Sequence, residues 1–113
     1  MAAPVHLNRA LVLEVPERAP DGAGGHVVTW QPRGTLWAEL RARTGREAAE
    51  GAAHLARASY RITLRAAPPG SPSRPEAGQR FRMGARLFAI LAVLEAGQDG
   101  RLLTYFAEEE VAQ

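Results

Sequence analysis

The side chains that could carry out catalysis or hold a metal ion are few and scattered. The histidines lack the spacing of metal ligands and the chain has no cysteine, so we predict no metal site at His6, His26 or His54. The serines begin a strand or stand in a proline-rich loop, and none has the context of a nucleophile beside a base. We therefore expect no catalytic residue, no cofactor and no enzymatic activity.

A glycine-rich turn and two tryptophans are the remaining local motifs. The run Gly22-Ala-Gly-Gly25 joins two predicted strands rather than a strand and a helix, so it predicts a hairpin turn and not a phosphate-binding loop. Trp30 and Trp37 have two interpretations. They could stack on bases, as in oligonucleotide-binding barrels. The favoured interpretation is that they supply core and interface area, as tryptophan does in most small β domains.

The basic residues are all arginine, 14 in number, and arginine binds phosphate and carboxylate as a planar fork. The formal net charge is only +2, which is too small to indicate strong polyanion binding, and the frequent alanine indicates a GC-rich genome instead. Segments 41–65 and 74–86 are net basic, whereas the tail from Glu95 onward is net acidic. This asymmetry fits copies that dock head to tail, and it fits two solvated faces equally well.

Length and composition predict one domain over residues 1–113. With 46% hydrophobic and 23% charged residues, the chain has room for one core and lacks the composition of a disordered polymer. No apolar run reaches the roughly 18 residues of a membrane span, and the amino terminus lacks the features of a secretory signal. The absence of cysteine fits synthesis in a reducing cytoplasm.

Alternation and turn signals predict a mainly β fold. Pro32-Arg33-Gly34 interrupts the second strand as a bulge would, after the turn at 21–25. Residues 86–94 are apolar on both faces, which predicts a central strand buried on both sides. About six strands are expected, over residues 10–15, 26–41, 59–66, 80–83, 86–94 and 102–107. Their short spacing predicts a small antiparallel β-barrel or sandwich.

One short helix is expected between the second and third strands. Thr44-Gly-Arg-Glu47 fits the capping box, in which the Thr44 hydroxyl and the Glu47 carboxylate satisfy each other's backbone amides. Alanine-rich residues 48–57 follow, with only small apolar side chains apart from Leu55. Gly51 at the centre costs this helix roughly 1 kcal/mol relative to alanine. The segment therefore predicts a weak helix at a surface.

The order of these motifs resembles the phage head–tail joining family of head-closure (stopper) and head–tail adaptor proteins. The resemblance extends from about residue 9 to residue 110. It rests on the turn at 21–25, Thr29-Trp30, Leu36-Trp37-Ala38-Glu39, Thr44-Gly45-Arg46-Glu47, Tyr60-Arg61-Ile62-Thr63-Leu64-Arg65, and Arg86-Leu87-Phe88-Ala89-Ile90 with Val93. It implies a small β-barrel protein of tailed phages or gene-transfer-agent particles.

The resemblance also implies a place of action and a set of partners. It implies a homo-oligomeric ring, of six or twelve copies, in the neck of a virion or phage-like particle assembled in the bacterial cytoplasm. The ring would contact the portal or its adaptor on the head side and a tail terminator or tail protein on the tail side. Double-stranded DNA would pass through it without sequence specificity, and packaged DNA would be retained. No membrane is implied.

The candidate site residues follow from this resemblance. In the family, the connection between the second and third strands, here residues 42–58, faces the channel. Arg43, Arg46 and Arg57 are therefore candidates for weak phosphate contacts in the DNA channel, and Gly51 for a change of shape there. The candidates for contacts between subunits are Trp37, Arg61, Arg65, Glu108, Glu109 and Glu110.

Two other functions compete with the stopper interpretation. A free-standing nucleic-acid-binding barrel would use Trp30 and Trp37 as stacking groups. A tail-completion protein would occupy a different place in the same connector. The proline-rich loop Pro68–Pro75 is longer than the family pattern, and its role is open.

Overall fold

The computed structural model describes residues 5–43, 58–68, 70–96 and 100–110, and within these ranges it is built from strands. The strands are β1 (Arg9–Pro20), β2 (His26–Ala42), β3 (Ser59–Arg65), β4 (Arg80–Met83), β5 (Arg86–Ala96) and β6 (Leu102–Glu109). The mainly β prediction with about six strands is confirmed. The predicted helix falls on residues 44–57, which lie outside the described residues.

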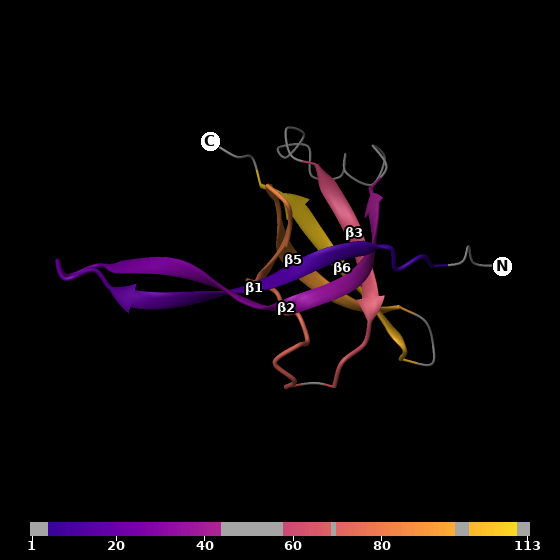
Figure 1. Cartoon of the computed structure of the whole chain (residues 1–113), viewed down its shortest axis with the longest axis horizontal. Coiled ribbons are helices and arrows are strands. Elements are labelled where there is room, and N and C mark those ends of the chain that lie inside the picture. Colours follow the sequence, from indigo (N-terminus) through magenta and orange to yellow (C-terminus); the bar gives the residue numbers. More distant parts are fainter. Residues whose placement is uncertain (1–4, 44–57, 69, 97–99, 111–113) are drawn as a thin grey trace.

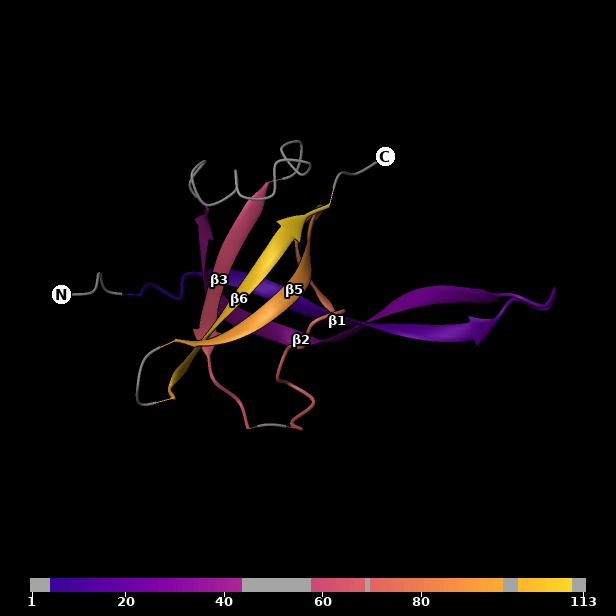
Figure 2. The ribbon, with the colours of Figure 1, turned by 180° about the vertical axis from the view of Figure 1, so that it is seen from behind.

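The six strands form one antiparallel sheet that closes into a barrel in the order β1-β2-β3-β6-β5-β4. The closing pair is β1 with β4, where Val12, Leu13 and Glu14 lie opposite Arg82, Phe81 and Arg80. Figure 1 shows β1 and β2 on the near side of the barrel, and the view from behind in Figure 2 shows β5 and β6 on the other side. Of the two architectures that the sequence leaves open, the chain adopts the barrel.

The core fills the barrel from alternate positions of every strand. Ile62 and Leu64 point inward from β3, as the alternation of this strand predicts, and both are buried. Phe81 and Tyr105 meet edge to face inside the barrel, with ring centroids 5.9 Å apart. The buried Tyr105 hydroxyl donates to the Pro75 carbonyl at 2.9 Å. This bond ties the proline-rich loop to the core.

The bulge predicted at Pro32-Arg33-Gly34 is present. The pairing of β1 with β2 shifts register there, because Leu13 lies opposite Gly34 whereas Glu14 lies opposite Pro32. Arg33 is therefore the extra residue of the bulge. Gly34 has a φ of +130°, a conformation that glycine adopts without strain.

Strand β5 is not buried on both sides, so that prediction is wrong. Phe88 and Ile90 are buried inside the barrel, whereas Leu91 and Leu94 are 52% and 49% exposed. A strand of a closed barrel has one inward face only, and among the described residues no second layer covers the outer face of β5. The outer leucines of β5 therefore contribute apolar surface to the exterior of this chain.

Strand β1 is longer than predicted, because its pairing with β2 continues beyond the barrel to Pro20 opposite His26. The paired segments 16–20 and 26–30, with the turn at 21–25, form a ribbon that projects from the barrel (Figure 1), and we call residues 16–30 the arm. The predicted turn is confirmed: the Asp21 carboxylate accepts hydrogen bonds from the amides of Ala23 at 2.8 Å and Gly25 at 3.0 Å. These two amides lower the pKa of Asp21.

Candidate functional site

The end of the barrel from which residues 44–57 depart carries a cluster of arginines around one aromatic ring. The guanidinium of Arg43 lies 5.1 Å from the ring centroid of Phe106, and that of Arg61 lies 5.6 Å from the same centroid. The Arg43 amide donates to the Ser59 carbonyl at 2.9 Å, which extends the β2–β3 pairing. Arg41 lies directly opposite Arg61 in that pairing. Three arginines therefore gather on the outside of the barrel at this end, where Arg41 also pairs with Glu39 at 3.2 Å and Glu108 lies opposite Ser59.

This cluster joins residues that the sequence assigned to two different roles. Arg43 is a candidate for the DNA channel, and Arg61 is a candidate for a contact between subunits. Both pack on Phe106, which the sequence did not single out. The other channel candidates, Arg46, Gly51 and Arg57, lie outside the described residues.

Two further interface candidates meet at the opposite end of β3. Trp37 is 59% exposed on the outside of β2. It lines a hollow of about 240 Å³ together with Arg65 of β3. The structure therefore brings Trp37 and Arg65 to one surface.

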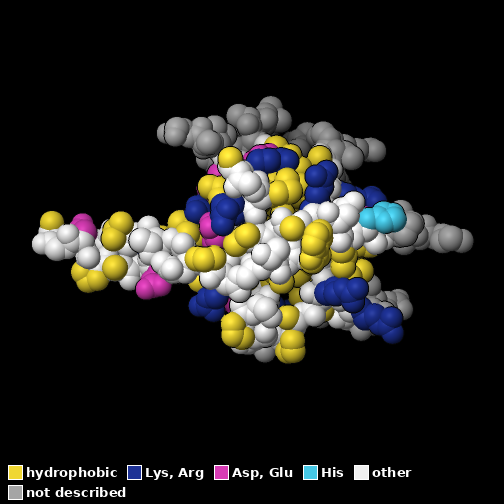
Figure 3. All heavy atoms as spheres, in the orientation of Figure 1, with side chains coloured by type: hydrophobic (Ala, Val, Ile, Leu, Met, Phe, Trp, Pro, Cys, Tyr) yellow, Lys and Arg dark blue, Asp and Glu magenta, His cyan; other side chains and the backbone are white. Residues whose placement is uncertain are grey.

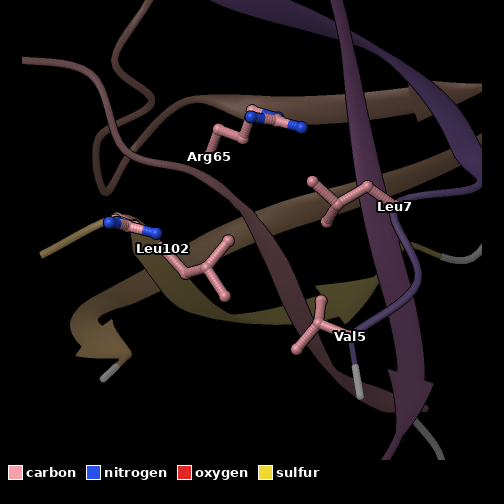
Figure 4. Close-up of a pocket in the computed structure, with 5 residues that line it drawn as sticks. Val5, Leu7, Arg65 and Leu102 are labelled. Atoms are coloured by element: carbon pink, nitrogen blue, oxygen red, sulfur yellow. The ribbon is translucent and has the colours of Figure 1, made fainter. Parts of the chain in front are cut away.

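Arg65 also lines a second hollow, of about 300 Å³, between the amino-terminal segment and the start of β6. Its walls are Val5, Leu7 and Leu102, and Arg101 is the second arginine that lines it. Figure 4 shows Val5 and Leu7 facing Leu102 across the hollow, with Arg65 at its edge. The segment that supplies these walls is held on the barrel, since the His6 amide donates to Oε2 of Glu39 at 3.1 Å. We call the surface formed by these five lining residues the dibasic hollow.

The acidic residues near the carboxyl end do not form one patch. Glu109 accepts two hydrogen bonds from Arg86, at 2.8 and 3.0 Å, and one from the Tyr60 hydroxyl at 3.3 Å. The bonds from Arg86 lower the pKa of Glu109. Glu110 lies 3.8 Å from Arg80, and Glu108 lies opposite Ser59 at the end of β6. That these three residues join subunits stays a prediction.

The most enclosed charged group of the described chain was not found from the sequence. Glu14, 6% exposed, accepts hydrogen bonds from Arg80 at 2.7 Å and from Arg82 at 2.9 Å. Burial raises the pKa of Glu14, but the hydrogen bonds from Arg82 and Arg80 outweigh it, so the pKa is lowered. The guanidinium of Arg80 also lies 4.1 Å from the ring centroid of Trp30 in the arm.

A signal for this cluster exists in the sequence. Glu14 interrupts an otherwise apolar strand, and Arg80 and Arg82 alternate with Phe81 in a short strand. An isolated carboxylate and two arginines on the same face of neighbouring strands would pair across the sheet. What the sequence does not show is that β1 and β4 are neighbours. The cluster fixes the base of the arm on the barrel.

The arm itself presents apolar and acidic groups to the outside. Val27 and Val28 are 47% and 44% exposed. The space-filling view in Figure 3 shows a mostly uncharged arm, whereas arginines gather over the barrel. Its charged residues are Glu17 and Asp21 against Arg18, which leaves the arm net acidic.

The described residues offer no arrangement for metal binding: no group of three or more histidine, cysteine or acidic side chains converges among them. His54 lies outside the described residues. Ser71 and Ser73 are within hydrogen-bond distance of each other, at 2.9 Å between their hydroxyl oxygens. In the part of the chain that the structure describes, no helix is long and apolar enough to span a membrane.

Comparison with known proteins yields one family, and the solved structures that match include the two described below. The model of the family described as phage head completion protein matches residues 2–110. A chain in the structure of the virion of a native gene transfer agent particle is 46% identical, with a TM-score of 0.72, and the match covers 95% of this chain and 98% of that one. The solution structure of protein SF1141 from Shigella flexneri 2a is 20% identical, with a TM-score of 0.70 and coverage of 95% and 96%, which supports the fold alone. No curated protein matches.

Proposed function

Because the chain belongs to the phage head completion protein family, we propose that it is a head–tail connector of a tailed phage or gene-transfer-agent particle. It acts as a stopper: copies form a ring between the portal or its adaptor and the tail, and the ring helps to retain packaged DNA. The role is structural and not enzymatic. The particle neck is its place of action.

The observation that carries this proposal is the likeness to a chain of a gene transfer agent virion. The match covers 95% of this chain at 46% identity overall, so the aligned region includes most of both the barrel and the arm. The likeness therefore reaches the surfaces that would contact other subunits as well as the core. A free-standing enzyme or binding module would not be expected to share those surfaces with a virion component.

The arginines at the end of the barrel support a DNA-facing surface. Arg43 stacks on Phe106 at the point where the connection 44–57 begins, with Arg61 on the same ring. A guanidinium held on an aromatic ring keeps its positive charge while the ring fixes its position, which suits weak attraction to DNA phosphates. Few such contacts per copy hold DNA without preventing it from sliding.

The proposal is tested in particles whose only copy of the chain carries a substitution. Arg43→Ala should leave the chain in the particles but raise the share of packaged DNA that nuclease digests, and Arg43→Lys should restore much of the protection because it keeps the charge. Arg33→Ala, at the exposed bulge, is the matched control. Removing the whole gene should leave heads that lose their DNA. Heads that stay full and tailed without the chain would refute the connector role.

The nucleic-acid-binding alternative is favoured by one observation only, the exposure of Trp37. Trp30 is less suited to stacking on a base, because the Arg80 guanidinium lies over its ring at 4.1 Å. The two tryptophans also face different neighbours, since Trp37 lines a hollow with Arg65 of β3. Titration of the isolated chain with single-stranded DNA, followed by tryptophan fluorescence, separates the two functions. Strong quenching that salt reverses would favour the alternative.

A further inference from the structure

The two ends of strand β1 carry surfaces of complementary character. At one end β1 enters the arm, and at the other it begins two residues after Leu7, which lines the dibasic hollow. Figure 1 shows the arm projecting to one side of the barrel and the amino-terminal segment on the opposite side. The arm is net acidic, whereas the hollow has two arginines. The molecule therefore has an acidic projection and a basic recess at opposite ends.

The outer part of the arm has few contacts of its own in the described chain. Residues 16–20 pair with 26–30, and in the described part of the chain neither segment pairs with another strand. A two-stranded ribbon without further packing is marginally stable in water. The ion pairs of Glu14 hold the base of the arm, but its outer part has no barrel beneath it. Packing against another surface would bury the outer part of the ribbon and stabilise it.

The register of the arm decides which of its faces suits the hollow. Glu17 lies opposite Thr29, and Ala19 lies opposite Val27, so these four residues share one face of the ribbon. Arg18 and Val28, which also lie opposite each other, occupy the other face. The first face combines a carboxylate with apolar side chains, and the second combines an apolar side chain with a positive charge.

The dibasic hollow matches the first of these faces. Val5 and Leu102 line the hollow with apolar surface that would suit Val27, and Arg65 and Arg101 line it with positively charged side chains that would suit Glu17. The second face would bring Arg18 against two arginines. Val5 is itself 39% exposed, so this apolar wall is open to a neighbour.

We propose that the Glu17–Val27 face of the arm docks in the dibasic hollow of the next copy of the chain. The inference rests on the proposed ring. Such a contact joins two different surfaces, and repetition of a contact of this kind closes into a ring when the rotation between copies permits. The arm then acts as the link between neighbours. This adds Val5, Glu17, Val27 and Arg101 to the residues expected at the subunit interface.

Disulfide cross-linking tests the contact directly, because the chain has no cysteine of its own. The test variant carries Val5→Cys and Val27→Cys, and the matched control carries Val5→Cys and Val28→Cys on the opposite face of the arm. A disulfide requires Cβ atoms about 3.5–4.5 Å apart, so it distinguishes the two faces. Purified particles that contain each variant are oxidised and separated by denaturing electrophoresis without reductant.

The test variant should lose its 12.2 kDa band to a ladder of multiples of that mass, and the control should keep most of it. Mixed particles built from the two single variants, Val5→Cys and Val27→Cys, should stop at dimers, because each copy then has one cysteine. Equal ladders from test and control, no ladder from particles that contain the chain, or dimers from Val27→Cys alone would overturn the proposal. Full, tailed particles that lack the chain altogether would instead refute the connector role.

Discussion

Replacing Glu14 with glutamine should destabilise the fold more than any comparable change of a surface carboxylate. Glu14 is enclosed at the junction of β1 and β4 and accepts from Arg80 at 2.7 Å and Arg82 at 2.9 Å. Glutamine keeps the shape but removes the charge. Its NH₂ group would also face a guanidinium, donor against donor.

The size of the loss follows from the exposure of the partners. Breaking a buried ion pair by removing one member costs about 3–5 kcal/mol, because the other charge stays buried. Here the side chain of Arg80 is 16% exposed and that of Arg82 is 40% exposed, so water can solvate the second. The expected loss is therefore near the lower end, about 3 kcal/mol of unfolding free energy.

Urea unfolding at neutral pH measures this loss. With a denaturant slope of about 1–3 kcal/mol per molar, the midpoint should fall by about 1–3 M. Glu17→Gln on the exposed arm is the control and should change the free energy by less than about 0.5 kcal/mol. Arg80→Ala should cost more than Arg82→Ala, since Arg80 is less exposed and also stacks on Trp30. A Glu14→Gln variant as stable as the control would refute the reasoning.

Three further outcomes are expected from unfolding experiments. The folded-state pKa of Glu109 lies below its ordinary value of 4.5, so its contribution to the unfolding free energy is complete above that value. The contribution is lost as the pH falls through the folded-state pKa, and Glu109→Gln should therefore lose less unfolding free energy on acidification. Tyr105→Phe removes the hydrogen bond to Pro75 and should cost about 1–1.5 kcal/mol and speed proteolysis of the proline-rich loop. Ile90→Ala should cost about 2–5 kcal/mol, whereas Leu91→Ala should cost less than about 1 kcal/mol.

Each of these outcomes has a clear contrary result. If Glu109→Gln lost as much unfolding free energy on acidification as the unsubstituted protein, the Arg86 contact would not persist in solution. Unchanged proteolysis of Tyr105→Phe would mean that the loop is held by other groups. Equal losses for Ile90→Ala and Leu91→Ala would mean that both faces of β5 are buried in the isolated chain, as the sequence had predicted.

Features set by neighbouring residues were predictable from the sequence. The turn at 21–25 depends on its glycines and on Asp21, and the bulge at Pro32-Arg33-Gly34 depends on residues adjacent in the chain. The alternation of residues 60–65 placed Ile62 and Leu64 inside without reference to other strands. The motif order also identified the family, and the match over residues 2–110 confirms that resemblance.

Features set by residues far apart in the chain were not predictable. Glu14 meets Arg80 across 66 positions, and that contact exists only because β4 closes the barrel against β1. The apolar outer face of β5 was assigned to the interior because composition does not distinguish a covered face from one that stays open. The sequence analysis ended the first strand at residue 15, whereas the paired ribbon continues through 16–20 and accommodates two prolines at its edge.

The most direct test of the connector role is a reconstruction of the intact particle by electron microscopy. It should place copies of this barrel in a closed ring at the junction of head and tail, with the connection 42–58 directed toward the DNA. The arm of each copy should lie on the next copy, at Arg65 and Arg101. Density for the chain anywhere other than that junction, or particles with a complete neck built without it, would contradict the account.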